Sequence, residues 1–312
     1  MLHRTIDTLG WLVTDPIGKA RPGRSPHRVI HRQGSAQVRW FPAEGKRALF
    51  VSMPLINTWT IWDLLPGRSV VEALVQAGID VYLLDWGPQH ADAEDRPLAH
   101  FVDEVLGRAI ARSRRHFGGD LNVAGYCVGG TFLAWHLARN GTEGVSGAAF
   151  VATPIDFHAS GRLARWADPE HFPVDTLHGN FPAERMRASF AWLRPMGQVK
   201  KYKALVDGDA DFRELWAHLE AWSATGVDFP GACYREYVRA CYFDNRVRDE
   251  LGAVGIPALS IAADRDHIVP PAAAHDLVQV WGGPTATTTL RGGHVGICVG
   301  SGLPTALAAW VP

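Results

Sequence analysis

Leu121-Asn122-Val123-Ala124-Gly125-Tyr126-Cys127-Val128-Gly129-Gly130-Thr131 is the stretch that decides how this sequence folds. An apolar run typical of a buried strand ends at a glycine, a cysteine follows on a turn, and two glycines lead into the helical pattern of residues 132–138. A strand, a tight turn that carries a nucleophile and a helix form a nucleophile elbow, whose usual pattern is G-x-S-x-G. Here the pattern is G-x-C-x-G, so a sulfur stands where an oxygen is usual.

Cys127 is therefore the first candidate catalytic residue. A free cysteine is more often a small buried packing residue. The elbow outweighs that interpretation here, because it presents the side chain at the carboxyl end of a strand, just before a helix whose N-terminus favours a thiolate. Cys233, Cys241 and Cys298 lack such a context, and we expect them to be packing residues.

The segments around the elbow predict the fold class. Short apolar runs alternate with helical patterns, which implies right-handed βαβ units and a mostly parallel sheet with helices on both faces. Together with the elbow, this predicts an α/β-hydrolase fold. The expected strands are 48–53, 80–86, 147–153, 258–263 and 285–290, and the expected helices are 69–77, 101–117, 272–281 and 303–310.

The alternation predicts three kinds of segment. Residues 1–40 contain several prolines and glycines and are expected to be an irregular lead-in, with one short helix near residues 5–13. Residues 41–155 and 246–312 form the predicted α/β-hydrolase core. Residues 156–245 break the alternation and predict an inserted cap, or lid, with helices around 183–193, 211–222 and 234–243. Caps of this kind shape access to a site.

Composition excludes several classes of function. The chain has 312 residues, 47% of them hydrophobic, and a formal net charge of -1, so nothing favours a nucleic acid as partner. The four cysteines are far apart, with no zinc-type spacing, which predicts no metal site and a reduced, cytoplasmic protein. No secretory signal is apparent, and the longest apolar runs, about ten residues, are shorter than the ~20 that a transmembrane helix needs.

A thiol nucleophile needs a base, since the pKa of a free thiol is about 8.5. In this fold the chain order is nucleophile, acid, histidine. Asp264-Arg265-Asp266-His267 follows the predicted strand 258–263, and His294 follows the strand 285–290. We assign His294 as the base and Asp266 as the residue that orients it, and we interpret Asp264 as a turn residue. His267 is either a neighbour of the site in a supporting position or a solvated side chain.

An oxyanion hole needs two backbone donors. The first is the N–H of the residue after the nucleophile, Val128, and the second comes from the loop after the strand 48–53, at Ile56 or a neighbour. Asn57 in that loop is a further candidate for a supporting position beside the site.

Seven segments together carry a resemblance to a known family. They are Pro54-Leu55-Ile56-Asn57 with Asp63-Leu64-Leu65-Pro66-Gly67-Arg68-Ser69, Val81-Tyr82-Leu83-Leu84-Asp85-Trp86-Gly87, the elbow Gly125–Thr131, Thr153-Pro154-Ile155-Asp156-Phe157, Asp228-Phe229-Pro230-Gly231, Asp266-His267-Ile268-Val269-Pro270 and Gly292-Gly293-His294-Val295-Gly296. Over roughly residues 40–300 the chain resembles the polyhydroxyalkanoate synthase catalytic subunits, of the shorter, class III-like type that lacks the long N-terminal domain and needs a second subunit.

The resemblance implies a Cys-His-Asp acyltransferase that polymerises (R)-3-hydroxyacyl-CoA, such as 3-hydroxybutyryl-CoA, through an acyl-Cys intermediate. It implies no cofactor other than the coenzyme A thioester substrate, and as partners a growing polyester chain, a second synthase subunit and a second copy in a homodimer. It also places the protein in the cytoplasm, at polyester granules.

Three alternatives remain open at this point. An acyl or aminoacyl shuttle between the phosphopantetheine thiols of carrier proteins would use the same Cys-His-Asp chemistry. A thioesterase or depolymerase would release a free acid, although most such hydrolases use serine. A non-catalytic granule scaffold would not need Cys127.

Overall fold

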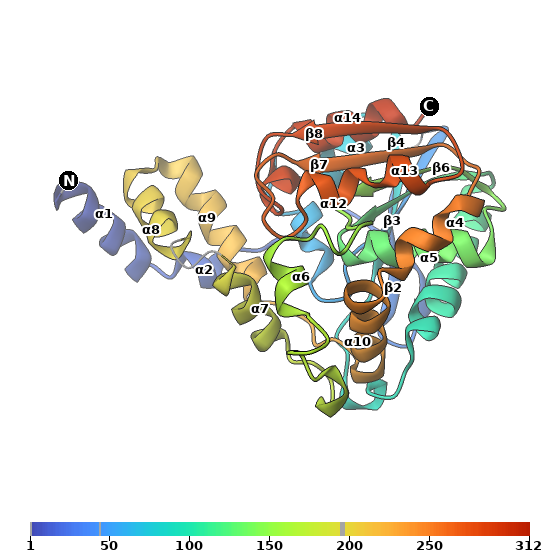
Figure 1. Ribbon diagram of the computed structural model, residues 1–312. Coiled ribbons are helices and arrows are strands. Elements are labelled where there is room, and N and C mark those ends of the chain that lie inside the picture. The colour runs from blue at the N-terminus through green and yellow to red at the C-terminus, as the bar shows by residue number, and fades with distance from the viewer. Residues whose placement is uncertain (1, 44, 194–196) are drawn as a thin grey trace.

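The computed structural model describes residues 2–43, 45–193 and 197–312, and its centre is one eight-stranded sheet (Figure 1). The strand order is β1-β2-β4-β3-β5-β6-β7-β8. The pairs β1/β2 and β2/β4 are antiparallel, and the other neighbours are parallel. The strands are β1 Arg28–Gln33, β2 Ala36–Phe41, β3 Arg47–Ser52, β4 Ile79–Asp85, β5 Leu121–Tyr126, β6 Val145–Val151, β7 Ala258–Ala263 and β8 Thr285–Leu290. The predicted α/β-hydrolase architecture is confirmed.

The central strands are apolar because helices cover both faces of the sheet. Every residue of β5 and β7 is buried, as is nearly all of β3, β4 and β6. Two of the covering helices, α4 and α5, pack against each other on one face, and α3 packs against α14 on the other (Figure 1). The helical elements of this part are η1 Trp59–Trp62, α3 Val70–Gln76, η2 Ala91–Ala93, the π-helix η3 His100–Val105, α4 Leu106–Phe117, α5 Val128–Asn140, α12 Pro271–His275, α13 Leu277–Val280, η7 Gly296–Val299 and α14 Gly302–Trp310.

The short helix predicted near residues 5–13 is present, but the prediction that the rest of residues 1–40 is irregular is wrong. They form α1 (Leu2–Val13), α2 (Pro16–Lys19) and the hairpin β1/β2, which extends the sheet beyond β4. Pro16 begins α2, a position where proline fits a helix. The hairpin turns at Gly34, whose φ is 58°. Within β2, Ala36, Val38 and Phe41 are buried, an almost alternating pattern that the nearby prolines and glycines obscured.

Helices fill the segment between β6 and β7. They are α6 Arg162–Trp166, η4 Val174–Thr176, α7 Ala183–Trp192, α8 Gly197–Asp207, α9 Ala210–Ser223, α10 Gly231–Val238, the π-helix η5 Arg239–Phe243, α11 Arg246–Glu250 and η6 Leu251–Ala253. The three predicted helices correspond to α7, to α9, and to α10 continued by η5, whereas α8 was not predicted. The division into a core and a cap at residues 156 and 245 stays a prediction.

The lead-in helices pack on this insertion, beside the main body of the molecule (Figure 1). Leu205, Trp216 and Ala217 of α8 and α9 are buried against Trp11 and Ile17, among other residues of the first twenty. The ring centroids of Trp11 and Trp216 are 6.1 Å apart. The start of the chain and the insertion therefore share a small apolar core of their own. No helix within the described ranges has the length and apolar character to cross a membrane.

Asp63 ties the lead-in to the main body. Its carboxylate accepts hydrogen bonds from the backbone N–H of Ser25 at 2.8 Å and from the hydroxyls of Ser25 and Ser69, each at 2.7 Å. The side chain is buried, and Ser69 is also the N-cap of α3, where it accepts a hydrogen bond from the N–H of Glu72. Asp63, the first residue of the segment Asp63–Ser69, thus has a structural role.

We expect Asp63→Ala to lower the free energy of unfolding by about 3 kcal/mol, since it leaves several buried donors without their charged acceptor. Urea unfolding followed by circular dichroism measures this. Asp92→Ala, which removes an exposed carboxylate paired with Arg96, is the control and should change little. Equal curves for the two variants would contradict this role for Asp63.

Candidate active site

The nucleophile elbow is present in the geometry of the backbone. Cys127 follows β5 directly and precedes α5, with φ 52° and ψ −127°. A non-glycine residue with positive φ is strained, and such strain concentrates at functional sites. The turn closes tightly: a Cβ on Gly125 would collide with the backbone of Gly130, and one on Gly129 with the backbone at Ser52 and Met53. Both glycines are therefore required by the close approach of the chain.

Two loops at the same edge of the sheet bring Asp266 and His294 to the elbow. Asp266 follows β7, His294 follows β8, and the carboxyl ends of parallel strands meet at one edge. His294 Nδ1 lies 2.6 Å from Asp266 Oδ2, and His294 and Cys127 line the same cavity. Cys127 and His294 are each 7% exposed, and Asp266 is 6% exposed. The structure thus brings the three predicted catalytic side chains together in a nearly dry site.

The two oxygens of Asp266 have different tasks. Oδ1 accepts hydrogen bonds from the backbone N–H groups of Ile268 and Val269, at 2.8 and 2.9 Å, and Oδ2 faces His294. The carboxylate is therefore held by its own loop while it orients the ring. Asp264 instead accepts a hydrogen bond from the N–H of Gly292 at 2.7 Å, which joins the β7 loop to the β8 loop. The sequence predicts that Asp264 alone bonds the backbone of its turn, but Asp266 also accepts hydrogen bonds from the backbone of its own turn.

The protonation of His294 follows from its neighbours. Burial by itself would lower the pKa of His294, but the charges of Cys127 and Asp266 and hydrogen bonds to both raise that pKa above its ordinary value. The interaction is reciprocal: a protonated His294 stabilises a thiolate at Cys127. His294 therefore carries a proton and lies between the sulfur of Cys127 and the carboxylate of Asp266.

Alkylation tests whether His294 activates the thiol of Cys127. Because the raised pKa keeps His294 protonated at neutral pH, wild-type Cys127 should react rapidly with iodoacetamide at pH 6–7. In His294→Gln the thiol has no imidazolium, only a few per cent is thiolate at pH 7, and the rate should fall about 10- to 30-fold. The loss should shrink as the pH rises through about 8.5. Peptide mass mapping locates the label.

His275→Gln is the matched control, because His275 contacts Ser260 and Thr289 instead of a cysteine. It should react at the wild-type rate. A His294→Gln variant that keeps the wild-type rate at pH 6–7 would show that His294 does not activate Cys127.

Tyr126 is a site residue that the sequence did not reveal. Its hydroxyl donates a hydrogen bond to the carbonyl oxygen of His294 at 3.1 Å, and its ring stacks on the imidazole with centroids 5.4 Å apart. It is the variable residue of G-x-C-x-G, so only its place before the nucleophile hinted at a role. Tyr126 holds the β8 loop, and hence His294, against the elbow.

The backbone donors predicted for an oxyanion hole lie beside Cys127. Val128 is the first residue of α5, so its N–H has no acceptor within the helix. Ile56 lines the same cavities as Cys127, and its carbonyl accepts a hydrogen bond from the N–H of Val227. Asn57 lines one of these cavities, whereas His267 lines neither. The roles of all four stay predictions.

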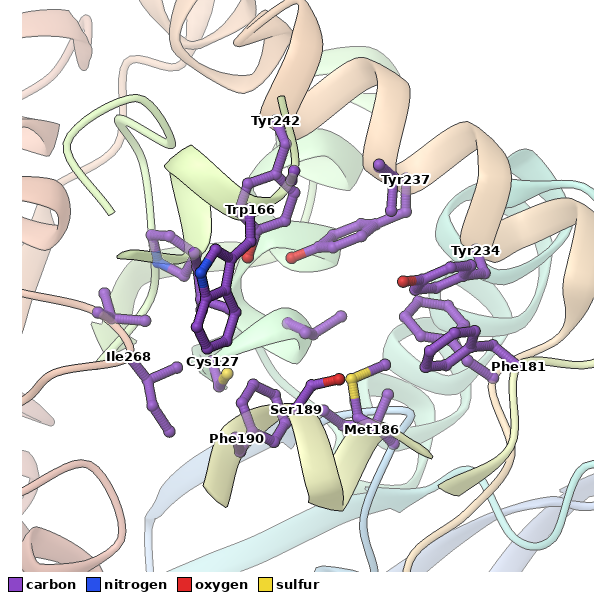
Figure 2. A pocket seen from close by; sticks show the side chains of 18 of the residues that line it. Cys127, Trp166, Phe181, Met186, Ser189, Phe190, Tyr234, Tyr237, Tyr242 and Ile268 are labelled. Carbon is purple, nitrogen blue, oxygen red and sulfur yellow. The ribbon is translucent and has the colours of Figure 1, made fainter. Parts of the chain in front are cut away.

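Two cavities meet at Cys127. The first, here called the aromatic chamber, has a volume of about 130 Å³, and its walls are mainly apolar and aromatic (Figure 2). The second, the His294 chamber, has a volume of about 260 Å³ and includes Asn57, Arg187 and His294. Ile56, Met186, Phe190 and Ile268 contribute to both. The aromatic chamber is further lined by Leu163, Trp166, Phe172, Phe181, Ser189, Phe229, Tyr234, Tyr237, Val238 and Tyr242.

The other three cysteines are buried thiols. Burial raises the pKa of Cys233 and Cys241 well above the ordinary value and that of Cys298 to about 12, so all three stay protonated. Among the described residues, Asp168, Glu170 and His171 are the one group spaced closely enough to hold a metal ion, and none of them lines either chamber.

Comparisons with known proteins agree with this fold. A family model described as the alpha/beta hydrolase fold matches residues 62–299, so the chain belongs to that class. A solved structure, the monoacylglycerol lipase of Paleococcus ferrophilus, superposes with a TM-score of 0.55 at 14% identity, covering 88% of this chain and 97% of its own. At that identity the likeness concerns the fold alone.

Curated relatives identify the family of this chain within the alpha/beta hydrolase class. The chain is 30% identical to the poly(3-hydroxyalkanoate) polymerase subunit PhaC of Allochromatium vinosum, over 80% of this chain and 75% of that protein. It is 28% identical to the subunit of the same name from Haloferax mediterranei, over 92% of this chain. The chain belongs to the poly(3-hydroxyalkanoate) polymerase family. It spans 63% of the length of the Haloferax relative.

Proposed function

We propose that this protein is a catalytic subunit that polymerises 3-hydroxyacyl groups from coenzyme A thioesters, by way of an acyl group on Cys127. The observation that carries the proposal is the elbow cysteine, which shares one cavity with His294 and opens onto an apolar chamber. Membership of the polymerase family supports the substrate class. Within the proposal, Cys127 is the nucleophile, His294 the proton carrier and Asp266 the residue that orients it.

The first half-reaction loads the enzyme. The Cys127 thiolate attacks the thioester carbonyl, and the N–H groups of Val128 and Ile56 stabilise the oxyanion. The carbon–sulfur bond to coenzyme A then breaks, and the leaving thiolate takes the proton of His294. Acylation removes the negative charge that held the proton on the imidazole, so the transfer becomes easier as the acyl-enzyme forms.

The second half-reaction lengthens the chain. Neutral His294 accepts the proton of a 3-hydroxyl group, whose oxygen attacks the acyl-Cys carbonyl. The new ester bond forms, the bond to Cys127 sulfur breaks, and the thiolate–imidazolium pair is restored. A thioester intermediate suits this sequence, because exchange between two thioesters is nearly isoenergetic while transfer to an alcohol is favourable.

The proposal includes its setting. The names of the Haloferax and Allochromatium relatives both contain the word subunit, which supports a second synthase subunit as partner. We further propose a cytoplasmic location at polyester granules, a homodimer, and no cofactor beyond the thioester substrate.

The test is incubation with (R)-3-hydroxybutyryl-CoA, with and without a co-expressed second subunit, followed by analysis of free coenzyme A and of the acyl product. Polymer is the expected product. Free 3-hydroxybutyrate alone would identify a hydrolase, and no release of coenzyme A under either condition would rule the proposal out.

A further inference from the structure

The aromatic chamber has a polar wall formed by three tyrosines. Tyr234 and Tyr237 extend from α10, and Tyr242 extends from η5, toward the space that they share with α7 and Cys127 (Figure 2). The hydroxyls of Tyr234 and Tyr242 have no hydrogen-bond partner within the described ranges. Burial raises the pKa of both, so each hydroxyl keeps its proton and is a donor at any ordinary pH.

A π-helical turn puts Tyr242 on this wall. In an α-helix the residue four positions after Tyr237 would share its face, and that residue is Cys241. The five residues of η5 form a π-helix, with bonds between residues five apart, so the face moves forward by one position to Tyr242. Such turns occur often at functional sites.

Aromatic neighbours fix the directions of these side chains. Tyr234 stacks on Phe181 with centroids 4.3 Å apart, and Tyr242 packs edge-on against Phe157 at 5.0 Å. Tyr237 and Tyr242 extend toward the end of the chamber where Cys127 lies (Figure 2). Tyr234 lies farther along.

Tyr234 and Tyr242 are half-buried, and a hydrocarbon chain that filled this chamber would cover both hydroxyls without offering them an acceptor, which is unfavourable. We propose that the chamber selects an oxygenated acyl chain: Tyr242 donates a hydrogen bond to the 3-oxygen of the acyl group on Cys127, and Tyr234 donates one to the ester carbonyl of the next unit. This inference rests on the proposed function and names Tyr242 and Tyr234 as specificity-determining residues.

The test compares acylation by (R)-3-hydroxybutyryl-CoA and by butyryl-CoA, which lacks the 3-oxygen, in rapid-quench single turnovers. Coenzyme A is quantified by chromatography and the adduct by intact mass. The wild type should prefer the hydroxyacyl donor about 10- to 100-fold in kcat/KM. Tyr242→Phe should lose about tenfold with that donor and nothing with butyryl-CoA, since one hydrogen bond is removed and the ring is kept.

Two further variants sharpen the test. Tyr234→Phe should slow loading from a 3-hydroxybutyryl trimer thioester about tenfold more than it slows loading of the monomer. Tyr82→Phe is the matched control, because its buried hydroxyl bonds His116 far from the chambers, and it should keep every preference of the wild type.

Equal losses with both monomer donors in Tyr242→Phe, or a wild type without preference, would overturn the inference while the proposed function stands. Failure of both donors to acylate wild-type Cys127 would instead overturn the proposed function, and this inference with it.

Discussion

Cys127→Ala is expected to reduce acyl transfer from (R)-3-hydroxybutyryl-CoA by about 10⁴- to 10⁶-fold, the scale on which the loss of a nucleophile acts in a catalytic triad. No other thiol can replace it. Even for Cys298, burial raises the pKa of the thiol to about 12, so this residue does not form a thiolate at neutral pH. Steady-state release of coenzyme A measures the loss.

The fold of this variant should persist, because the side chain of Cys127 makes no N-cap hydrogen bond to α5 and alanine is only slightly smaller. Cys233→Ala, which removes a buried thiol that lines neither chamber, is the control and should remain active. A Cys127→Ala protein within tenfold of wild-type activity would exclude acyl-Cys chemistry and favour a scaffold role.

Asp266→Asn is expected to cost about 10³- to 10⁴-fold in kcat, as loss of the orienting carboxylate does in other triads. The amide oxygen can still accept the loop hydrogen bonds from Ile268 and Val269. The amide NH₂ would then face His294 Nδ1, where it favours the wrong tautomer. The variant therefore keeps the loop and loses the orientation of the ring.

The pH dependence gives this variant a second readout. The charge of Asp266 helps to raise the pKa of His294, so its removal lowers that pKa, and the imidazolium is lost at a lower pH. The high-pH limb of the rate profile should move toward neutrality. Asp264→Asn, which weakens only the bond to Gly292 in the neighbouring loop, is the control. Equal losses in the two variants would show that loop order, rather than the carboxylate beside His294, explains the effect.

The meeting of Cys127, Asp266 and His294 could be predicted from the sequence because this fold delivers residues in a fixed order. A buried strand ending in G-x-C-x-G, an aspartate after β7 and a histidine after β8 must meet at one edge of a parallel sheet. That argument needs only strand ends and chain order, and both can be derived from local patterns. It says nothing about which residue of a loop faces which partner, and so it missed that Asp266 also holds its own turn.

Long-range contacts explain what the sequence did not predict. Tyr126 acts through the backbone of His294, which is 168 residues away along the chain. Helix α1 packs on α8 and α9 rather than on the sheet, so no nearby pattern indicates its partner. The placement of Tyr242 depends on the π-helical turn, and simple helical spacing would instead put Cys241 on the chamber wall.

In the proposed mechanism the acyl group passes through the sulfur of Cys127. Intact mass and peptide mapping after a millisecond quench with (R)-3-hydroxybutyryl-CoA test it most directly. We predict a single 3-hydroxybutyryl adduct on the peptide that contains Cys127, formed as coenzyme A is released and lost when further substrate is added. Polymer formed without any adduct on that peptide, or with the adduct on another residue, would contradict the account.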